Sequence, residues 1–144
     1  MTTRQEIIDR ISDQDTAKVF KEVAGVSDIN AITKGRTSTP GVYVFRLRRQ
    51  AGANTAGTGV VQKVNDSYAV VIVEDTGRDT RGGDASDLIE AHCEQIQSAL
   101  LNWIPGSGKR GLEYDGGRLV TIKGGRIFWQ EIYTLPGNQI RQLN

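Results

Sequence analysis

Apolar residues recur at helical spacing near the N-terminus of the chain. Thr3 and Glu6 form a capping box, in which each side chain accepts a hydrogen bond from an otherwise unpaired backbone amide. Three isoleucines then follow on one helical face: Ile7, Ile8 and Ile11. This pattern predicts a helix that begins near Arg4. The stretch from Thr16 to Ala24, ahead of Gly25, predicts a shorter helix or a turn.

A second and longer helical stripe follows the polar segment from Asp75 to Asp84, which contains three glycines and predicts a loop. Asp84 or Ser86 can cap this helix, and Pro105 with Gly106 prevents it from continuing. Its apolar residues lie largely on one face. They are Leu88, Ile89, Cys93, Ile96, Leu100 and Trp103. We therefore expect this helix to pack on a sheet.

Alternating and β-branched runs predict strands in the middle of the chain. The run from Val42 to Leu47 is typical of a half-buried strand. Val60 to Val64 and Tyr68 to Val73 predict two more strands, and the short polar side chains from Asn65 to Ser67 suit a tight turn between them. A hairpin is therefore expected there. The segment from Arg49 to Gly59 is small and polar without periodicity, so it predicts a mobile loop.

The C-terminal part predicts a further hairpin. Arg118 to Ile122 and Arg126 to Thr134 are strand-like, and Gly124 with Gly125 between them tolerates positive φ. Together with the helices, these strands predict an α+β fold in a single domain over residues 1–144, a length within the usual range of about 50 to 250 residues. We expect a mostly antiparallel twisted sheet, packed on one face by the N-terminal helix and the second long helix.

The charge of the chain is unevenly distributed, although the net formal charge is only +1. No acidic residue lies between Ile29 and Asn65, where every charged side chain is basic. From Glu74 to Glu94, seven acidic residues stand against Arg78 and Arg81. One interpretation of these blocks is solvated loop and helix surface. The other is a pair of complementary patches on neighbouring subunits, because head-to-tail contacts join two different surfaces.

Few residues in the chain could take part in catalysis, form a disulfide or bind a metal ion. Cys93 is the only cysteine, which excludes an internal disulfide and a paired-cysteine metal site, and we expect it in the core. His92 is the only histidine, and its helical neighbours Glu90 and Glu94 do not converge with it on a metal ion. A surface or edge position is expected for His92. The sequence therefore indicates no metal, no cofactor and no catalytic activity.

The segment from Gly106 to Arg110 is similar to a phosphate-binding loop but departs from it at two positions. Trp103 stands where that loop needs its first glycine, and Arg110 replaces the serine or threonine that binds magnesium. The large aromatic residues Trp103, Trp129 and Tyr133 are expected to pack in a core or an interface. No apolar run approaches roughly 18 residues, so the chain is expected to be soluble, not exported and without a membrane partner.

Three motifs in the C-terminal third resemble those of one known family. They are the Trp-x-Pro motif in Ala99 to Pro105, the Tyr-x-Gly-Gly-x-Leu motif in Leu112 to Leu119, and the Trp-x-x-x-Tyr motif in Ile127 to Thr134. The order of parts is also similar: an N-terminal helix, a strand after Thr39-Pro40, a loop, the strand from Val70 to Val73 and a long helix. The sequence resembles the bacteriophage tail terminator, or tail completion, proteins of the Mu-like contractile-tail group.

That resemblance implies a structural virion protein, assembled in the host cytoplasm, that forms a hexameric ring on the head-proximal end of the tail tube. Such a ring stops tube polymerisation and provides the interface to the neck. The implied partners are other copies of the chain, the tail tube protein and a neck or head-completion protein, with the tail sheath as a further candidate. Genomic DNA meets the ring only as it passes through the lumen. The charged segments supply candidate contacts with a neighbouring subunit or the tube: Arg48, Arg49, Arg78, Arg81 and Asp84.

Two other functions are compatible with the sequence. A head-to-tail connector or tube-like subunit of similar fold is one, and self-assembly separates a tube subunit from a terminator, since the first forms filaments and the second stops at a closed ring. The other is a small nucleotide-binding domain around Lys109 and Arg110. ATP with magnesium would stabilise that domain against unfolding.

Overall fold

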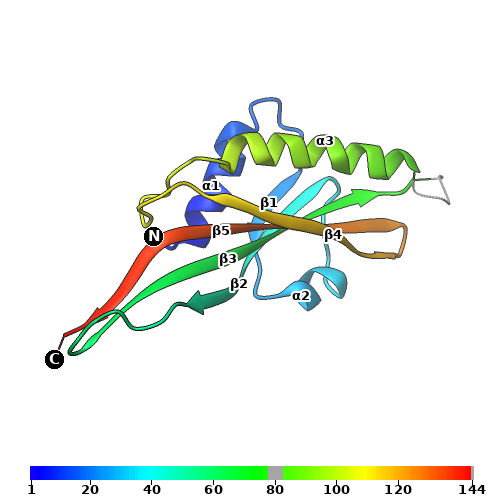
Figure 1. Ribbon diagram of the computed structural model, residues 1–144. Coiled ribbons are helices and arrows are strands. Elements are labelled where there is room, and N and C mark those ends of the chain that lie inside the picture. The colour runs from blue at the N-terminus through cyan, green and yellow to red at the C-terminus, as the bar shows by residue number, and fades with distance from the viewer. Residues whose placement is uncertain (78–82, 144) are drawn as a thin grey trace.

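A twisted five-stranded sheet forms the centre of the structure, a computed structural model that describes residues 1–77 and 83–143 (Figure 1). In chain order the elements are α1 (Thr3–Gln14), β1 (Glu22–Gly25), α2 (Ile29–Thr33), β2 (Gly41–Ala51), β3 (Val60–Asp75), α3 (Gly83–Leu100), β4 (Glu113–Lys123) and β5 (Arg126–Gln142). The strand order is β1-β2-β3-β5-β4, with β1 parallel to β2 and all other neighbours antiparallel. The predicted α+β class with a mostly antiparallel sheet is confirmed.

The helices α1 and α3 cover one face of the sheet, as predicted (Figure 1). The isoleucine stripe of α1 is buried, and so is the stripe of α3 that includes Ile89 and Ile96. Both stripes pack against alternate residues of the two central strands, such as Val42 and Val70. Burial of each such side chain contributes roughly 1.5–3 kcal/mol, so this layer is the principal core of the fold.

The first helix begins where the sequence predicts, but its cap differs from the prediction. Thr2 is the N-cap, and its hydroxyl accepts a hydrogen bond from the backbone amide of Gln5 at 3.2 Å. The Thr3 hydroxyl contacts that of Ser107 instead. The Glu6 carboxylate accepts a hydrogen bond from the amide of Gly106 in the same loop. Both residues of the predicted capping box therefore contact the loop that follows α3.

The long helix α3 ends earlier than predicted. It stops at Leu100, and Asn102 takes a positive φ of 62° that a helix cannot continue through. Trp103 lies beyond the helix and still packs on the core, with the guanidinium of Arg10 5.5 Å from its ring centroid. Leu88, which the sequence places on the apolar stripe, is exposed.

A short helix on the opposite face of the sheet was not predicted. α2 buries Ile32 against a second apolar cluster, which includes Phe45 and Val71. Asp28 caps this helix by accepting a hydrogen bond from the amide of Ala31 at 3.0 Å. Because α2 has five residues, its apolar periodicity is too short to be recognised in the sequence.

The segment predicted as a short helix or turn from Thr16 to Ala24 forms a turn and then the edge strand β1. The carboxylate of Asp15 accepts hydrogen bonds from the amides of Val19 and Phe20 at 2.9 and 3.0 Å, which fixes the turn. β1 then pairs in parallel with β2. The helical prediction was wrong for Glu22–Gly25 because pairing with a distant strand supplies the backbone hydrogen bonds there.

The predicted turn from Asn65 to Ser67 is wrong. β3 is one continuous strand that pairs with β2 on one side and β5 on the other. The polar residues lie opposite a β-bulge in β5, because Val64 pairs with Asn138 whereas Asp66 pairs with Leu135. Asp66 is buried at this bulge, so pairing on both sides overrides the local preference for a turn.

Beyond the bulge, β2, β3 and β5 continue as a narrow extension that we call the arm, residues 48–65 and 138–142. Figure 1 shows the arm projecting from the body toward the lower left, with the C-terminus at its tip. The predicted loop from Arg49 to Gly59 is shorter than expected, because β2 extends to Ala51. Asn54 closes the remaining connection by bonding to the carbonyl of Gly59 and the amide of Val61.

Candidate functional site

Of the five residues predicted to contact a neighbour, the structure describes three. Arg48 and Arg49 are exposed and consecutive on β2 at the base of the arm, so their side chains point to opposite faces of the strand. Asp84 is exposed in the first turn of α3, which begins at the end of the molecule opposite the arm (Figure 1). Arg78 and Arg81 lie outside the described residues. The structure therefore does not bring these side chains together: Arg48 and Arg49 line different pockets on opposite faces of β2, and Asp84 lies on a different surface from both.

Asp66 holds Arg49 at the bulge where the arm meets the body. Nε and Nη2 of Arg49 donate to the two carboxylate oxygens at 2.6 and 2.9 Å, and Nη2 of Arg46 donates to Oδ1 at 3.3 Å. The hydrogen bond from Arg49 holds the pKa of Asp66 below its usual value, although burial opposes that shift. This bidentate pair joins β2 to β3 where the arm begins.

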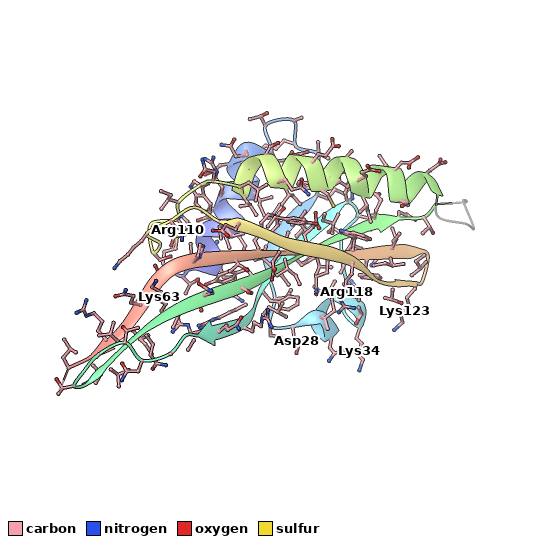
Figure 2. All side chains as sticks on the ribbon, viewed as in Figure 1. Asp28, Lys34, Lys63, Arg110, Arg118 and Lys123 are labelled. Atoms are coloured by element: carbon pink, nitrogen blue, oxygen red, sulfur yellow. The ribbon has the colours of Figure 1, made fainter. Side chains whose placement is uncertain are left out.

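The arm is basic along its length. Lys63 and Arg141 are exposed on it, in addition to Arg48 and Arg49, and its residues include no aspartate or glutamate. Figure 2 shows Lys63 on this extension, away from the helices. The arm therefore presents positive charge at one end of the molecule.

The helix α3 carries the opposite charge. Its exposed side chains include four acids: Asp84, Asp87, Glu90 and Glu94. The sequence from Gly83 to Leu100 contains no lysine or arginine. One molecule thus carries a basic surface on the arm and an acidic surface on α3, and these surfaces can attract each other between copies.

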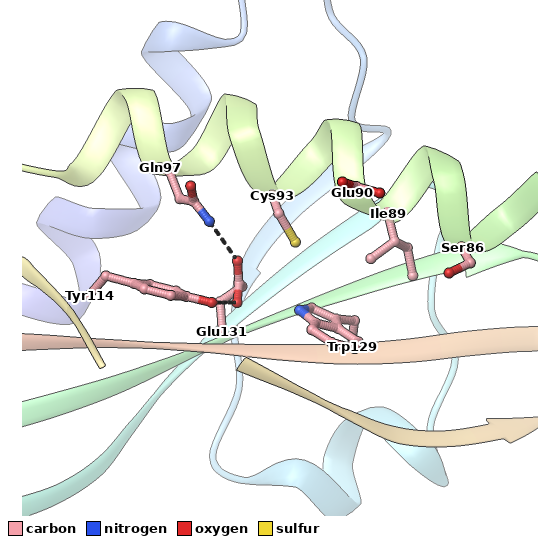
Figure 3. Close-up of a pocket in the computed structure, with 8 residues that line it drawn as sticks. All are labelled: Ser86, Ile89, Glu90, Cys93, Gln97, Tyr114, Trp129 and Glu131. Atoms are coloured by element: carbon pink, nitrogen blue, oxygen red, sulfur yellow. Dashed lines mark hydrogen bonds between the residues drawn. The ribbon is translucent and has the colours of Figure 1, made fainter. Parts of the chain in front are cut away.

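A pocket of about 290 Å³ lies between α3 and the β4–β5 hairpin (Figure 3). Glu131 of β5 lies at its base with 1 % of its surface exposed. The Tyr114 hydroxyl donates to Oε2 of Glu131 at 2.5 Å, and Nε2 of Gln97 donates to Oε1 at 3.2 Å. Within the described part of the chain, no lysine or arginine forms an ion pair with this carboxylate. The pocket is lined by Ser86, Ile89, Glu90, Cys93, Gln97, Tyr114, Trp129 and Glu131.

The groups beside Glu131 are held in their neutral forms. Burial raises the pKa of the Cys93 thiol, and the hydrogen bond and charge of Glu131 raise it further. The same causes, in the same order, raise the pKa of the Tyr114 hydroxyl. Burial also raises the pKa of Tyr133, whose ring meets that of Tyr114 edge-on at 5.6 Å. Cys93 is therefore a core thiol rather than a nucleophile, as expected.

Two further features shape the pocket. Gly117 of β4 has no side chain, and a Cβ atom there would collide with Oε2 of Glu131 and lie 3.0 Å from the Tyr114 hydroxyl. The buried indole nitrogen of Trp129 has no hydrogen-bond partner among the residues that the structure describes. In Figure 3 this nitrogen points into the same space as the Cys93 thiol and the Glu131 carboxylate. The pocket thus combines a carboxylate with an unused donor.

Sequence reasoning did not identify Glu131. Alternate residues of a strand point to the same face of a sheet, so Glu131 shares a face with Trp129 and Tyr133 on β5. Tyr133 is fully buried in the core beneath the helices. An acid two residues away from such an aromatic, within a strand-like run, was the signal that could have indicated a buried carboxylate.

The expectation of a surface or edge position for His92 is wrong. His92 is 5 % exposed, and its Nε2 lies 2.8 Å from Oε2 of the buried Glu74. Its ring also meets that of Phe20 edge-on. The helical spacing of His92 from Ile89 and Ile96 places it on the buried face of α3. Among the described residues, no group of three or more histidine, cysteine and acidic side chains could hold a metal ion.

The glycine-rich segment from Gly106 to Arg110 uses its backbone within the protein. The amide of Gly106 donates to the Glu6 carboxylate, and the amide of Gly108 donates to the carbonyl of Pro105 at 2.9 Å. The segment also follows a helix and precedes a strand, the reverse of a phosphate-binding loop. This arrangement argues against the nucleotide-binding alternative.

A basic arm and an acidic helix on separate surfaces are features of a subunit that assembles with neighbours. The profile of the phage tail terminator protein family matches residues 2–140. The chain therefore belongs to this family, as predicted, and is a structural protein of the phage tail. Its place in the Mu-like contractile-tail group stays a prediction.

Two further comparisons were made. No match was found among curated proteins. Among solved structures, a chain from the virion of a native gene transfer agent (GTA) particle is similar over 90 % of this chain and 92 % of that chain, with 11 % identity and a TM-score of 0.47. In the described ranges, no helix has the length and apolar character required to span a bilayer.

Proposed function

We propose that copies of this protein form a hexameric ring on the head-proximal end of the tail tube, stop tube polymerisation and provide the interface to the neck. The observation that carries this proposal is the family match, which spans residues 2–140 and so includes all three helices and all of the sheet and arm except the last two residues of β5. The protein acts through surface fit, without catalysis and without a cofactor. Its residues 1–144 act as one domain.

The opposite charges of the arm and α3 support a closed ring. Each copy places its arm against α3 of the next copy, and this contact repeats until the last copy meets the first. Arg48 and Asp84 take part in the contact, and Arg49 joins β2 to β3 at the base of the arm through Asp66. Arg78 and Arg81 lie outside the described residues, and their contact with a neighbouring subunit or the tube stays a proposal from the sequence.

The ring stops growth by occupying the end of the tube. A bound ring shows the next tube subunit a surface that it does not match, so polymerisation ends there. One face of the ring binds the tail tube protein and the other binds a neck or head-completion protein, with the tail sheath as a further partner. After assembly in the host cytoplasm the ring remains in the virion, and genomic DNA passes through its lumen.

A tube-length assay tests this function. Purified tube protein polymerises with increasing amounts of the terminator, and negative-stain images give the length distribution. We expect shorter tubes at amounts well below one terminator per tube subunit, because only tube ends are bound. Arg48→Glu should abolish the shortening, whereas Lys18→Glu, an exposed lysine outside the arm, should not. Unchanged tube lengths would refute the proposal, and filaments of the protein alone would identify a tube-like subunit instead.

A further inference from the structure

The carboxylate of Glu131 has no charged partner within its own subunit. A buried carboxylate is unfavourable unless hydrogen bonds and an opposite charge replace its hydration. Glu131 receives hydrogen bonds from three neutral groups, those of Tyr114, Gln97 and Cys93, while an ionised carboxylate can accept about four. The pocket above it is open to a group from outside the subunit.

The walls of the pocket match a lysine or arginine side chain. Ile89, Trp129 and Cys93 supply apolar surface for an aliphatic stem, and Glu131 can bind the charged end. The indole of Trp129 can also bind a cation against its ring face. Glu90, exposed on α3 at the rim, adds a second negative charge. A volume of about 290 Å³ lies at the lower limit for small-molecule pockets, which hold about 300–1,000 Å³, and suits a single side chain.

We infer that this pocket receives a basic side chain from the arm of a second copy of the chain. This inference rests on the proposed ring and names the contact that closes it. The arm supplies three exposed candidates: Arg48, Lys63 and Arg141. All of them lie on the arm, which projects from the body (Figure 1). The pocket is lined by residues of α3 and of the β4–β5 hairpin. Charge complementarity between the two surfaces selects a second copy as the occupant.

Self-association of the full chain gives the first test, measured by sedimentation over a range of concentrations. Glu131→Gln removes the charge but keeps the shape and a hydrogen-bond acceptor for Tyr114. We expect it to weaken assembly by roughly thirtyfold or more, as the loss of one partner from a buried charge pair does. Asp13→Asn removes a negative charge from an exposed position of α1, outside the arm and α3, and should weaken assembly by about threefold or less.

A double-mutant cycle identifies the inserted residue. Arg48→Gln, Lys63→Gln and Arg141→Gln are tested singly and then together with Glu131→Gln. One of them should match the loss caused by Glu131→Gln, and the corresponding double variant should lose no more than either single variant. Full additivity for all three residues would overturn the inference.

The fluorescence of Trp129 gives an independent readout. In a Trp103→Phe background Trp129 is the only tryptophan, so its emission reports on the pocket. We expect the emission to change as subunits assemble, and Glu131→Gln to suppress that change at equal extents of assembly. If Trp103→Phe prevents folding, which a melting curve shows, the mutant cycle in the natural background still decides the question.

The outcomes separate this inference from the proposed function. The pocket contact alone would be overturned by either of two results. In the first, Glu131→Gln forms rings as well as wild type does. In the second, rings form while the emission of Trp129 stays unchanged. If subunits assemble only at a tube end, the same variants are compared by the concentration that halves tube length. A protein that neither assembles nor shortens tubes would overturn the ring and the pocket contact together.

Discussion

Cys93 lies between α3 and the sheet, where burial and the neighbouring Glu131 carboxylate both disfavour its thiolate. Because the thiolate is the reactive form, the folded protein should react with a thiol reagent such as Ellman's reagent more than roughly tenfold slower than the unfolded chain at the same pH. A Ser98→Cys variant in a Cys93→Ala background supplies the control, since Ser98 is exposed on the same helix. Equal rates for Cys93 in the folded and unfolded protein would contradict this assignment.

The Asp66 carboxylate stabilises the fold in a pH-dependent manner. Arg49 lowers its pKa in the folded state, so this stabilisation is complete above the ordinary aspartate pKa of 3.8 and is lost as the pH falls through the lower, folded value. Asp66→Asn should therefore reduce the free energy of unfolding by about 1 kcal/mol at pH 7, a modest loss because Arg49 is 44 % exposed. Urea unfolding measures the difference.

The pH dependence of that difference is the more specific part of the prediction. Wild type and Asp66→Asn should converge in stability as the pH falls from 3.8 through the lower, folded pKa of Asp66, because below that value both carry a neutral side chain at this position. Asp13→Asn, at an exposed position of α1, should show no such convergence. A gap that stays constant down to about pH 2 would mean that Asp66 acts through packing rather than through its charge.

At the residue scale, the spacing of residues along the sequence indicates which side chains are buried better than it indicates which residues they contact. The spacing of His92 within α3 and of Glu131 within β5 could have placed both side chains on buried faces, although we expected His92 at the surface and did not single out Glu131. Their partners could not be predicted, because Glu74 is 18 residues from His92 and Gln97 is 34 residues from Glu131. Such pairs depend on how the helix lies on the sheet, which local periodicity does not determine.

At the scale of elements, local preference failed where pairing with distant strands decides the structure. The C-terminal hairpin was predicted correctly because Gly124 and Gly125, both at positive φ, form its turn and its strands adjoin in sequence. β1 and the bulge at Asp66 were missed because their backbone partners are distant residues. Residues 49–51 were predicted as loop for the same reason, since these residues become strand through pairing with residues 64–66 of β3.

The arm should be separable from the fold of the body. Residues 52–63 can be replaced by Asn-Gly, which joins the paired residues Ala51 and Val64 through a two-residue turn, and the chain can end at Asn138. Neither core cluster contains any of the removed residues. We expect a melting temperature within a few degrees of the full chain, together with loss of tube shortening. Normal tube shortening by this variant would remove the arm from the mechanism.

At the scale of the whole molecule, the two charged blocks of the sequence become two surfaces on different parts of the structure. Arg48 and Lys63 come from the basic block and lie on the arm, whereas Glu90 and Glu94 come from the acidic block and lie on α3. The sequence predicted complementary patches as one of two interpretations. It could not place them in space, because the position of Arg141 beside Val61 depends on the pairing of β5 with β3.

This placement makes a prediction about mixed assemblies. An arm-neutral variant carries Arg48→Gln, Lys63→Gln and Arg141→Gln, and a helix-neutral variant carries Asp87→Asn, Glu90→Gln and Glu131→Gln. In a head-to-tail ring each contact uses the arm of one copy and α3 of the next. Each variant alone should therefore remain monomeric under conditions in which wild type assembles.

Mixing the two variants should restore one contact and no more. The helix-neutral copy offers an intact arm, the arm-neutral copy offers an intact α3, and the pair that forms exposes only the two neutralised surfaces at its ends. Mass photometry should therefore show heterodimers and no larger species. Rings from the mixture would mean that other surfaces hold the assembly together, and monomers alone would mean that the arm does not bind α3. A heterodimer is thus the result that only a directional arm-to-helix contact produces.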